Sequence, residues 1–125
     1  MGDYLMSLIK CNDIQNASGG IPTVKGQKLI PSIWCRFDGT GGMVINDSEG
    51  CSSLIDYGVG NYAVNFTTAL ANTNYAAVGG AAISGNYTAV KTTITNSSRV
   101  AVDVSTLSTW TDAQIVSLVV MGGQA

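Results

Sequence analysis

From residue 33 onward the sequence alternates in hydrophobicity with a period of two, which is the spacing of side chains along β-strands. In SIWCRF at 32–37, the apolar positions 33, 35 and 37 fall on one face. The same alternation continues in NYAVNF, NYAAVGGAAIS, NYTAVKTTIT, RVAVDVSTL and QIVSLVVMG. Because turn-forming residues divide these runs about every 8 to 12 residues, we predict an all-β fold, an antiparallel β-sandwich or jelly-roll-like domain.

The stretch YGVGN at 57–61 lies between two of these runs and has the composition of a hairpin turn. Glycine adopts positive φ without a steric penalty, so it can close two paired strands. Helical signals are weak. A single helical turn fits 68–71. Another fits the segment TWTDAQ, which Thr111 would cap.

The composition is apolar for a chain of this size. Hydrophobic residues make up 46% of the 125 residues and charged residues 11%, whereas soluble domains carry about 25% charged residues. One domain of this length has a single modest core. We therefore expect an obligate oligomer in which another copy of the chain covers apolar surface. The competing interpretation is a monomer whose many small residues raise the mean hydropathy of +0.25 without forming patches.

The first 31 residues differ from the rest. Two short β-prone pieces, 5–11 and 23–29, are separated by NASGGIP and closed by Pro31. A two-stranded unit of this size is marginal by itself, so it must pack on something else. We predict an N-terminal anchoring and oligomerisation segment at 1–31 and a β-sandwich domain at 32–125.

The sequence shows neither a secretory signal nor a membrane helix, so we expect synthesis and assembly in a cytoplasm. No apolar run approaches the ~18 to 20 residues of a membrane helix, so membrane insertion is not expected. The start, MGDYLMSLIK, has Asp3 where a secretory signal needs basic residues.

The sequence lacks the residues that most catalytic sites and metal sites need. The sequence has no histidine and no C-x-x-C pair, which argues against zinc, and we expect Cys11, Cys35 and Cys51 to be buried free thiols. Cys35 and Cys51 fall on neighbouring predicted strands and could meet. The acidic turn DSEG lacks the ligand alternation of a calcium loop. We expect no cofactor.

The strongest enzymatic alternative is a glycan hydrolase that uses paired carboxylates. The available acids are Asp47, Glu49, Asp56 and Asp103. A domain this small has little room for a long substrate groove, so we expect no enzyme. A pI near 4.6 and scattered basic residues argue against nucleic acid as a partner.

Carbohydrate binding stays open. Aromatic rings beside Asp or Asn suit the apolar faces and polar edges of sugars. The candidates for glycan contact are Asp56, Tyr57, Asn61, Trp110 and Asp112. Tyr62 and Phe66 share the period of the core face, so we expect them to be packing residues.

The segment SSLIDYGVGNYAVNFTTALANTNYAAVGGAA resembles a β-domain found near the ends of bacteriophage tail fibres and short virion fibres, especially those of marine and cyanobacterial phages. WCRFDGTGGMVINDSEGCSSL is similar to the opening of that domain and AQIVSLVVMG to its final strand. The resemblance covers 33–122, and LIKCNDIQNASGG resembles the start of small fibre proteins. The cysteines are not part of the pattern.

This resemblance implies a homotrimeric virion protein, without enzymatic activity, that is assembled in the host cytoplasm. It implies that the N-terminal segment binds other virion proteins and that the displayed domain contacts host surface polysaccharide. Because the chain is nearly all domain, a capsid-decorating role competes with that of a short tail fibre. The alternative from another class is a free-standing carbohydrate-binding module.

Overall fold

The computed structural model describes residues 31–107 and 109–123, together with short stretches at 15, 17–19, 23–24 and 27–28. The chain divides into two compact units, 1–30 and 31–125. In the first unit, strands β1 (Thr23–Val24) and β2 (Gln27–Lys28) pair antiparallel. The β-prone piece expected at 5–11 lies outside the described residues.

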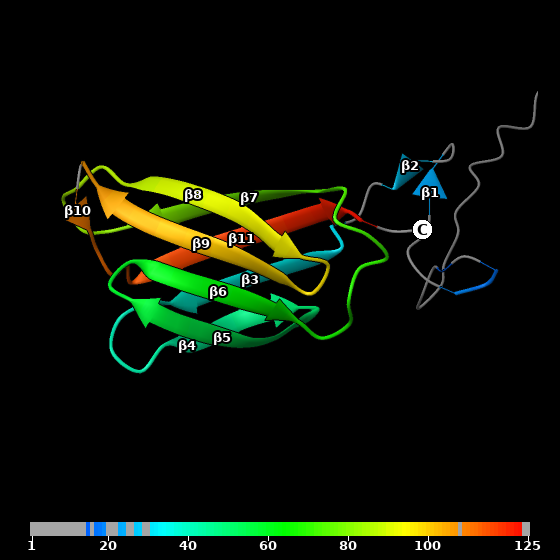
Figure 1. The fold of residues 1–125 in the computed structure, drawn as a ribbon, viewed down its shortest axis with the longest axis horizontal. Coiled ribbons are helices and arrows are strands. Elements are labelled where there is room, and N and C mark those ends of the chain that lie inside the picture. The colour runs from blue at the N-terminus through cyan, green and yellow to red at the C-terminus, as the bar shows by residue number, and fades with distance from the viewer. Residues whose placement is uncertain are drawn as a thin grey trace, which may run out of the picture. The chain divides into compact units, whose positions relative to one another are not determined.

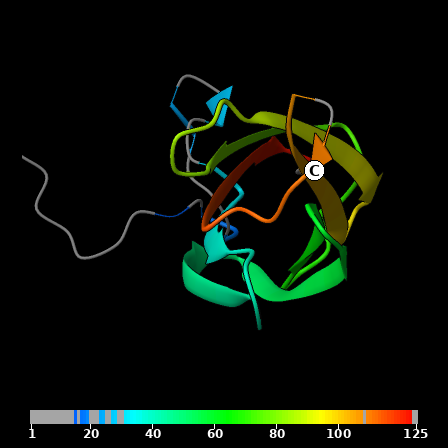
Figure 2. The ribbon, with the colours of Figure 1, turned by 90° about the vertical axis from the view of Figure 1, so that its left-hand side faces the viewer.

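The second unit is a sandwich of two antiparallel sheets (Figure 1), which confirms the predicted all-β class. Its strands are β3 (Ile33–Asp38), β4 (Val44–Glu49), β5 (Cys51–Gly58), β6 (Asn61–Phe66), β7 (Tyr75–Ala82), β8 (Ala89–Asn96), β9 (Arg99–Thr106), β10 (Thr109–Trp110) and β11 (Ile115–Gly122). One sheet has the order β4-β3-β11-β7. The other has the order β10-β9-β6-β5, with β8 also paired to β9. The two sheets are seen end-on in Figure 2.

The helical turn that fits 68–71 does not form. The amide of Leu70 donates to the Ser97 carbonyl at 2.8 Å, and the amide of Ala71 donates to the Gly123 carbonyl at 2.8 Å. These long-range bonds take the amides that a helix would use locally. The segment therefore bends between β6 and β7 as irregular backbone.

The core lies between the two sheets and is built from the alternate residues that the sequence pattern predicts. Phe37 on β3 and Tyr62 on β6 meet edge to face, with ring centroids 5.5 Å apart. Phe66 on β6 packs in the same way against Tyr75 on β7. Both Tyr62 and Phe66 are buried, so the prediction that they are packing residues is confirmed.

The chain links the two sheets at both long edges of the sandwich. At one edge β4 passes directly into β5 through Gly50, whose φ of +71° turns the chain from one sheet into the other. At the other edge β8 lies against β7. There the Thr92 hydroxyl donates to the Ala77 carbonyl at 2.8 Å and the Thr88 hydroxyl donates to the Ala81 carbonyl at 2.7 Å.

The strand directions give the sandwich two distinct ends. At the base end β3 begins and β11 finishes, so the link to residues 1–30 lies there (Figure 1). At the loop end lie the β3–β4 loop (39–43), the β5–β6 turn (59–60), the β7–β8 loop (83–88) and the connections around β10.

Candidate binding site at the loop end

The β5–β6 turn, within YGVGN, is held by two aspartates. Asp56 Oδ1 accepts a hydrogen bond from the Gly58 amide at 2.8 Å, and Asp112 Oδ1 accepts one from the Gly60 amide at 2.8 Å. Gly60 has a φ of +67°, and a Cβ there would collide with the Val104 carbonyl oxygen. The turn is therefore fixed by side chains from both of its flanks.

Asp112 also fixes a buried tyrosine. The Tyr62 hydroxyl donates to Asp112 Oδ1 at 2.9 Å, and the Ala113 amide donates to the same hydroxyl at 3.3 Å. The Gly39 carbonyl oxygen lies 3.1 Å from this hydroxyl. Burial raises the pKa of Tyr62 well above its ordinary range, and the hydrogen bond to Asp112 raises it further. The β3–β4 loop and the connection that precedes β11 thus meet at the Tyr62 side chain.

Large apolar side chains project from this framework into solvent. Tyr87 in the β7–β8 loop is 93% exposed, and Leu107 after β9 is 95% exposed. Trp110 on β10 and Val59 in the β5–β6 turn are also more than half exposed. Leu107 has a φ of +51°, a conformation that costs a leucine free energy. These four residues are called the tip residues below.

A shallow hollow lies beside the β3–β4 loop. It is lined by Gly42, Met43, Val44, Ile45, Leu54 and Asp56. Asp56 is the charged residue in this lining. Its Oδ1 already binds the Gly58 amide, so the carboxylate both supports the turn and borders the hollow.

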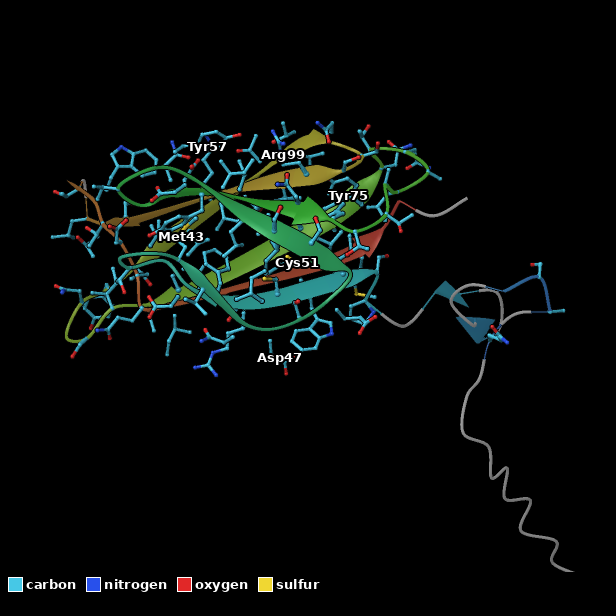
Figure 3. The ribbon with its side chains drawn as sticks, turned by 90° about the horizontal axis from the view of Figure 1, so that it is seen from below. Met43, Asp47, Cys51, Tyr57, Tyr75 and Arg99 are labelled. Atoms are coloured by element: carbon cyan, nitrogen blue, oxygen red, sulfur yellow. The ribbon has the colours of Figure 1, made fainter. Side chains whose placement is uncertain are left out.

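Tyr57 lies on the outer surface of the β8-containing sheet. Its hydroxyl accepts a hydrogen bond from Arg99 Nη1 at 3.4 Å, while Arg99 Nε donates to Asn65 Oδ1 at 2.6 Å. Asn65 Nδ2 donates in turn to the Ser53 hydroxyl at 3.0 Å. Figure 3 shows Tyr57 and Arg99 over the same face of the sandwich. A half-exposed ring beside a guanidinium and an amide has the composition of a sugar-contacting surface.

The structure places the five candidates for glycan contact in different surroundings. Asp56 borders the hollow, Tyr57 joins the network with Arg99, and Trp110 projects as a tip residue. Asn61 is half-buried at the start of β6, with Asp103 as its cross-strand partner. Asp112 accepts hydrogen bonds from the protein itself.

Sequence reasoning did not find Arg99 and Asn65. Both fall at polar positions of alternating strands, and nothing in the alternation distinguishes a position that faces Tyr57 from any other outward position. The missing information is the strand pairing, which sets Asn65 opposite Arg99.

The four acidic residues considered for glycan hydrolysis lie on three strands. Asp47 and Glu49 are on β4, Asp56 is on β5 beside the hollow, and Asp103 is on β9, where it pairs with Lys91 of β8. Within residues 31–107 and 109–123, no group of three or more acidic, cysteine or histidine side chains could hold a metal ion.

Two of the three thiols meet between the sheets. Cys35 on β3 is buried, and Cys51 begins β5. A hydrogen bond between these two side chains is the largest cause of a raised pKa at Cys35 and of a lowered pKa at Cys51. Both are free thiols, as expected, but only Cys35 is buried, and Cys51 is partly exposed. Cys11 lies outside the described residues.

The chain matches no protein-family model, no curated protein and no solved structure. Among the described residues, no helix is long and apolar enough to cross a membrane.

Proposed function

We propose that this protein is a non-enzymatic virion structural protein of a bacteriophage, a short tail fibre or a capsid fibre or decoration protein. It assembles as a homotrimer in the host cytoplasm and displays the β-sandwich domain on the particle. Residues 1–31 bind other virion proteins. The loop end contacts host surface polysaccharide.

The observation that carries this proposal is the polarity of the sandwich. Tip residues come from separate loops at one end, whereas β3 begins and β11 finishes at the other. A protein anchored through residues 1–31 would hold this loop end away from its attachment point. Exposed tyrosine and tryptophan supply large contact areas at low cost in side-chain entropy.

Avidity supports a role for weak contacts at the loop end. Its surface offers single aromatic side chains and one shallow hollow, so each domain would bind a glycan weakly. Several copies on one particle would bind a polymeric glycan together, and this raises the overall affinity without any new contact.

Particle association tests the anchoring role. In gradient-purified virions of a phage that encodes the chain, mass spectrometry should detect the full-length protein. A version that lacks residues 1–31 should stay in the particle-free fraction. Detection of the full-length chain only in that fraction would overturn the proposal.

A glycan array tests the binding role. Full-length protein should bind a subset of bacterial surface polysaccharides, and Trp110→Ala should reduce that binding at least about tenfold. Thr95→Ala, on β8 away from the loop end, is the matched control.

A second candidate function, the free-standing carbohydrate-binding module, is favoured by the exposed Tyr57 beside Arg99 and Asn65. It predicts a monomer whose glycan binding survives deletion of residues 1–31 and is lost with Tyr57→Ala. Retention of binding in that variant would remove this candidate.

A further inference from the structure

Cys35 and Cys51 face the same corner of the core from opposite sheets. Cys35 lies on β3 and is 1% exposed. Cys51 begins β5 and pairs across strands with Phe66 of β6, whose side chain is buried between the sheets. Directly opposed residues of neighbouring strands point to the same face of their sheet. The side chain of Cys51 therefore also points inward, and it packs against the core that contains Cys35.

The passage from β4 into β5 brings these two positions close together. Cys35 pairs with Ser48 on β4, and Cys51 follows Ser48 by three residues. Gly50 turns the chain between them, and a Cβ on Gly50 would lie 3.1 Å from Ile33 Cγ1. Stacked sheets lie about 10 Å apart face to face, but this turn holds the start of β5 directly against β3. Such an edge allows the short Cβ separation of a disulfide, about 3.8 Å.

The two thiols are in hydrogen-bond contact. The Cys35 thiol donates to the Cys51 sulfur, and this contact raises the pKa of Cys35 and lowers the pKa of Cys51. Burial raises the pKa of Cys35 further. Because the thiolate is the reactive form of cysteine, Cys51 is the better nucleophile of the pair.

Cys51 is also the thiol that a reagent in solution meets first. Cys51 is partly exposed, whereas Cys35 is buried. A hollow bordered by Glu49, Gly50 and Thr67 lies beside the turn that precedes Cys51. The pair thus consists of an accessible thiol and a buried thiol behind it, which is the arrangement of an attacking cysteine and a resolving cysteine.

From these observations we propose that Cys35 and Cys51 form a site of reversible oxidation, at which a small-molecule disulfide converts the two thiols into a disulfide that joins β3 to β5. The Cys51 thiolate attacks one sulfur of the small disulfide, forms a mixed disulfide and displaces one small thiolate. The Cys35 thiolate then attacks the Cys51 sulfur and displaces the second small thiolate. Two protein thiols are oxidised, one small disulfide is reduced to two thiols, and the cysteine protons end on those thiols.

The mixed disulfide favours the second step. The contact with Cys51 is the largest cause of the raised pKa of Cys35. A Cys51 sulfur within a mixed disulfide carries no negative charge to hold the Cys35 proton. The pKa of Cys35 therefore falls once Cys51 has reacted, and a larger fraction of Cys35 becomes the attacking thiolate.

The product is a covalent link between the two sheets. It closes a loop over residues 35–51, which contains all of β4, and restricts the unfolded chain. A protein assembled in a host cytoplasm keeps its thiols reduced, and it meets an oxidising medium when the particle is released. That consequence rests on the proposed function, whereas the chemistry of the thiol pair does not.

Oxidised glutathione is the probe for this site. Full-length protein with Cys11→Ser retains Cys35 and Cys51 as its thiols, and it is incubated with the probe at mildly alkaline pH. Intact-mass spectrometry should show a chain that has lost two hydrogen atoms and carries no glutathione. Peptide mapping should find Cys35 joined to Cys51, and dithiothreitol should restore the reduced mass.

Two further substitutions in the same background separate the steps. Cys35→Ala should stop at the mixed disulfide on Cys51, because no resolving thiol remains. Cys51→Ala should react at least about tenfold more slowly, because only the buried thiol is left. Circular dichroism verifies that both variants fold.

Thermal melting measures the link between the sheets. Oxidation of the protein that has both cysteines should raise the melting temperature by at least about 5 °C, and the same treatment of Cys35→Ala should not. An oxidised form that melts no higher would overturn the stabilising link.

The site itself is wrong if the folded protein with both cysteines keeps glutathione on Cys51 as a stable mixed disulfide, or reacts only when it is unfolded. Either result leaves the proposed function standing, because the particle-association experiment tests that function separately.

Discussion

The hydroxyl of Tyr62 donates a hydrogen bond to Asp112 Oδ1 at 2.9 Å, and so joins β6 to the connection that precedes β11. The same carboxylate oxygen accepts the amide of Gly60. Two residues 50 positions apart in sequence therefore set the geometry of the β5–β6 turn, from which Val59 projects. The arrangement of the loop end depends on this contact.

Removing either partner should destabilise the domain. Tyr62→Phe should lower the free energy of unfolding by about 1–2 kcal/mol, because it removes a buried hydroxyl that bonds a carboxylate. Asp112→Ala should cost about 2–3 kcal/mol, because it also leaves the Gly60 amide without its acceptor.

Urea denaturation of both single variants and of the double variant measures the coupling between them. We expect the double variant to cost less than the sum of the single changes. Strict additivity would mean that the two side chains act independently.

Stability should fall at alkaline pH. The folded state raises the pKa of Tyr62 above the ordinary tyrosine value of 10.0, so the folded protein holds this proton more tightly than the unfolded chain. The resulting stabilisation is fully present below pH 10 and is lost as pH rises towards the folded pKa. Urea titrations between pH 8 and about pH 11 should show this decline, and it should be smaller in Tyr62→Phe. An identical decline in both proteins would refute the assignment to Tyr62.

Gly60→Ala should be far more damaging than Gly42→Ala. A Cβ on Gly60 meets backbone atoms of Val104 and Thr111, and its φ of +67° disfavours alanine, whereas a Cβ on Gly42 meets no atom within 4 Å. We expect a loss of at least about 2 kcal/mol for Gly60→Ala and a change within about 0.5 kcal/mol for Gly42→Ala. Thermal melting distinguishes them, and equal melting temperatures would contradict the turn geometry.

The two paired thiols should react at different rates. In a Cys11→Ser background, a disulfide reagent should modify Cys51 at least about tenfold faster than Cys35, because the hydrogen bond between them lowers the pKa of Cys51 and raises that of Cys35. Mass spectrometry of quenched time points locates the modified residue. Equal rates for both, in folded protein, would mean that the thiols are not hydrogen-bonded.

The sequence predicts much of this fold because alternation specifies strands directly. The run at 33–37 has its apolar positions inward, and the predicted packing of Tyr62 and Phe66 follows from the same period. Glycine and asparagine indicate the turns because they adopt the left-handed backbone conformations that other residues disfavour. Local chemistry was sufficient for these features.

The pairing of strands could not be predicted from the sequence in the same way. It brings Arg99 to Tyr57 and Asp112 to Tyr62, and both contacts join residues more than 40 positions apart. Asp112 had been considered for glycan contact because it neighbours Trp110 in sequence. Its long-range acceptor role with Gly60 and Tyr62 could only emerge from the assembled sandwich.

The exposed apolar side chains of β7 and β11, Val78, Ile115, Val119 and Met121, are predicted from the sequence only as a compositional excess. A hydrophobic share of 46% indicated that some surface needs a cover, but it did not say which one. The location follows from the sheet order, since β11 is central and β7 lies beside it.

The most direct test of the central claim is the solution mass of the purified full-length protein by light scattering. Our account predicts a single species near three times the chain mass of 12.9 kDa. A clean 12.9 kDa monomer at micromolar concentration would contradict the trimeric virion protein and would favour the free-standing sugar-binding module instead.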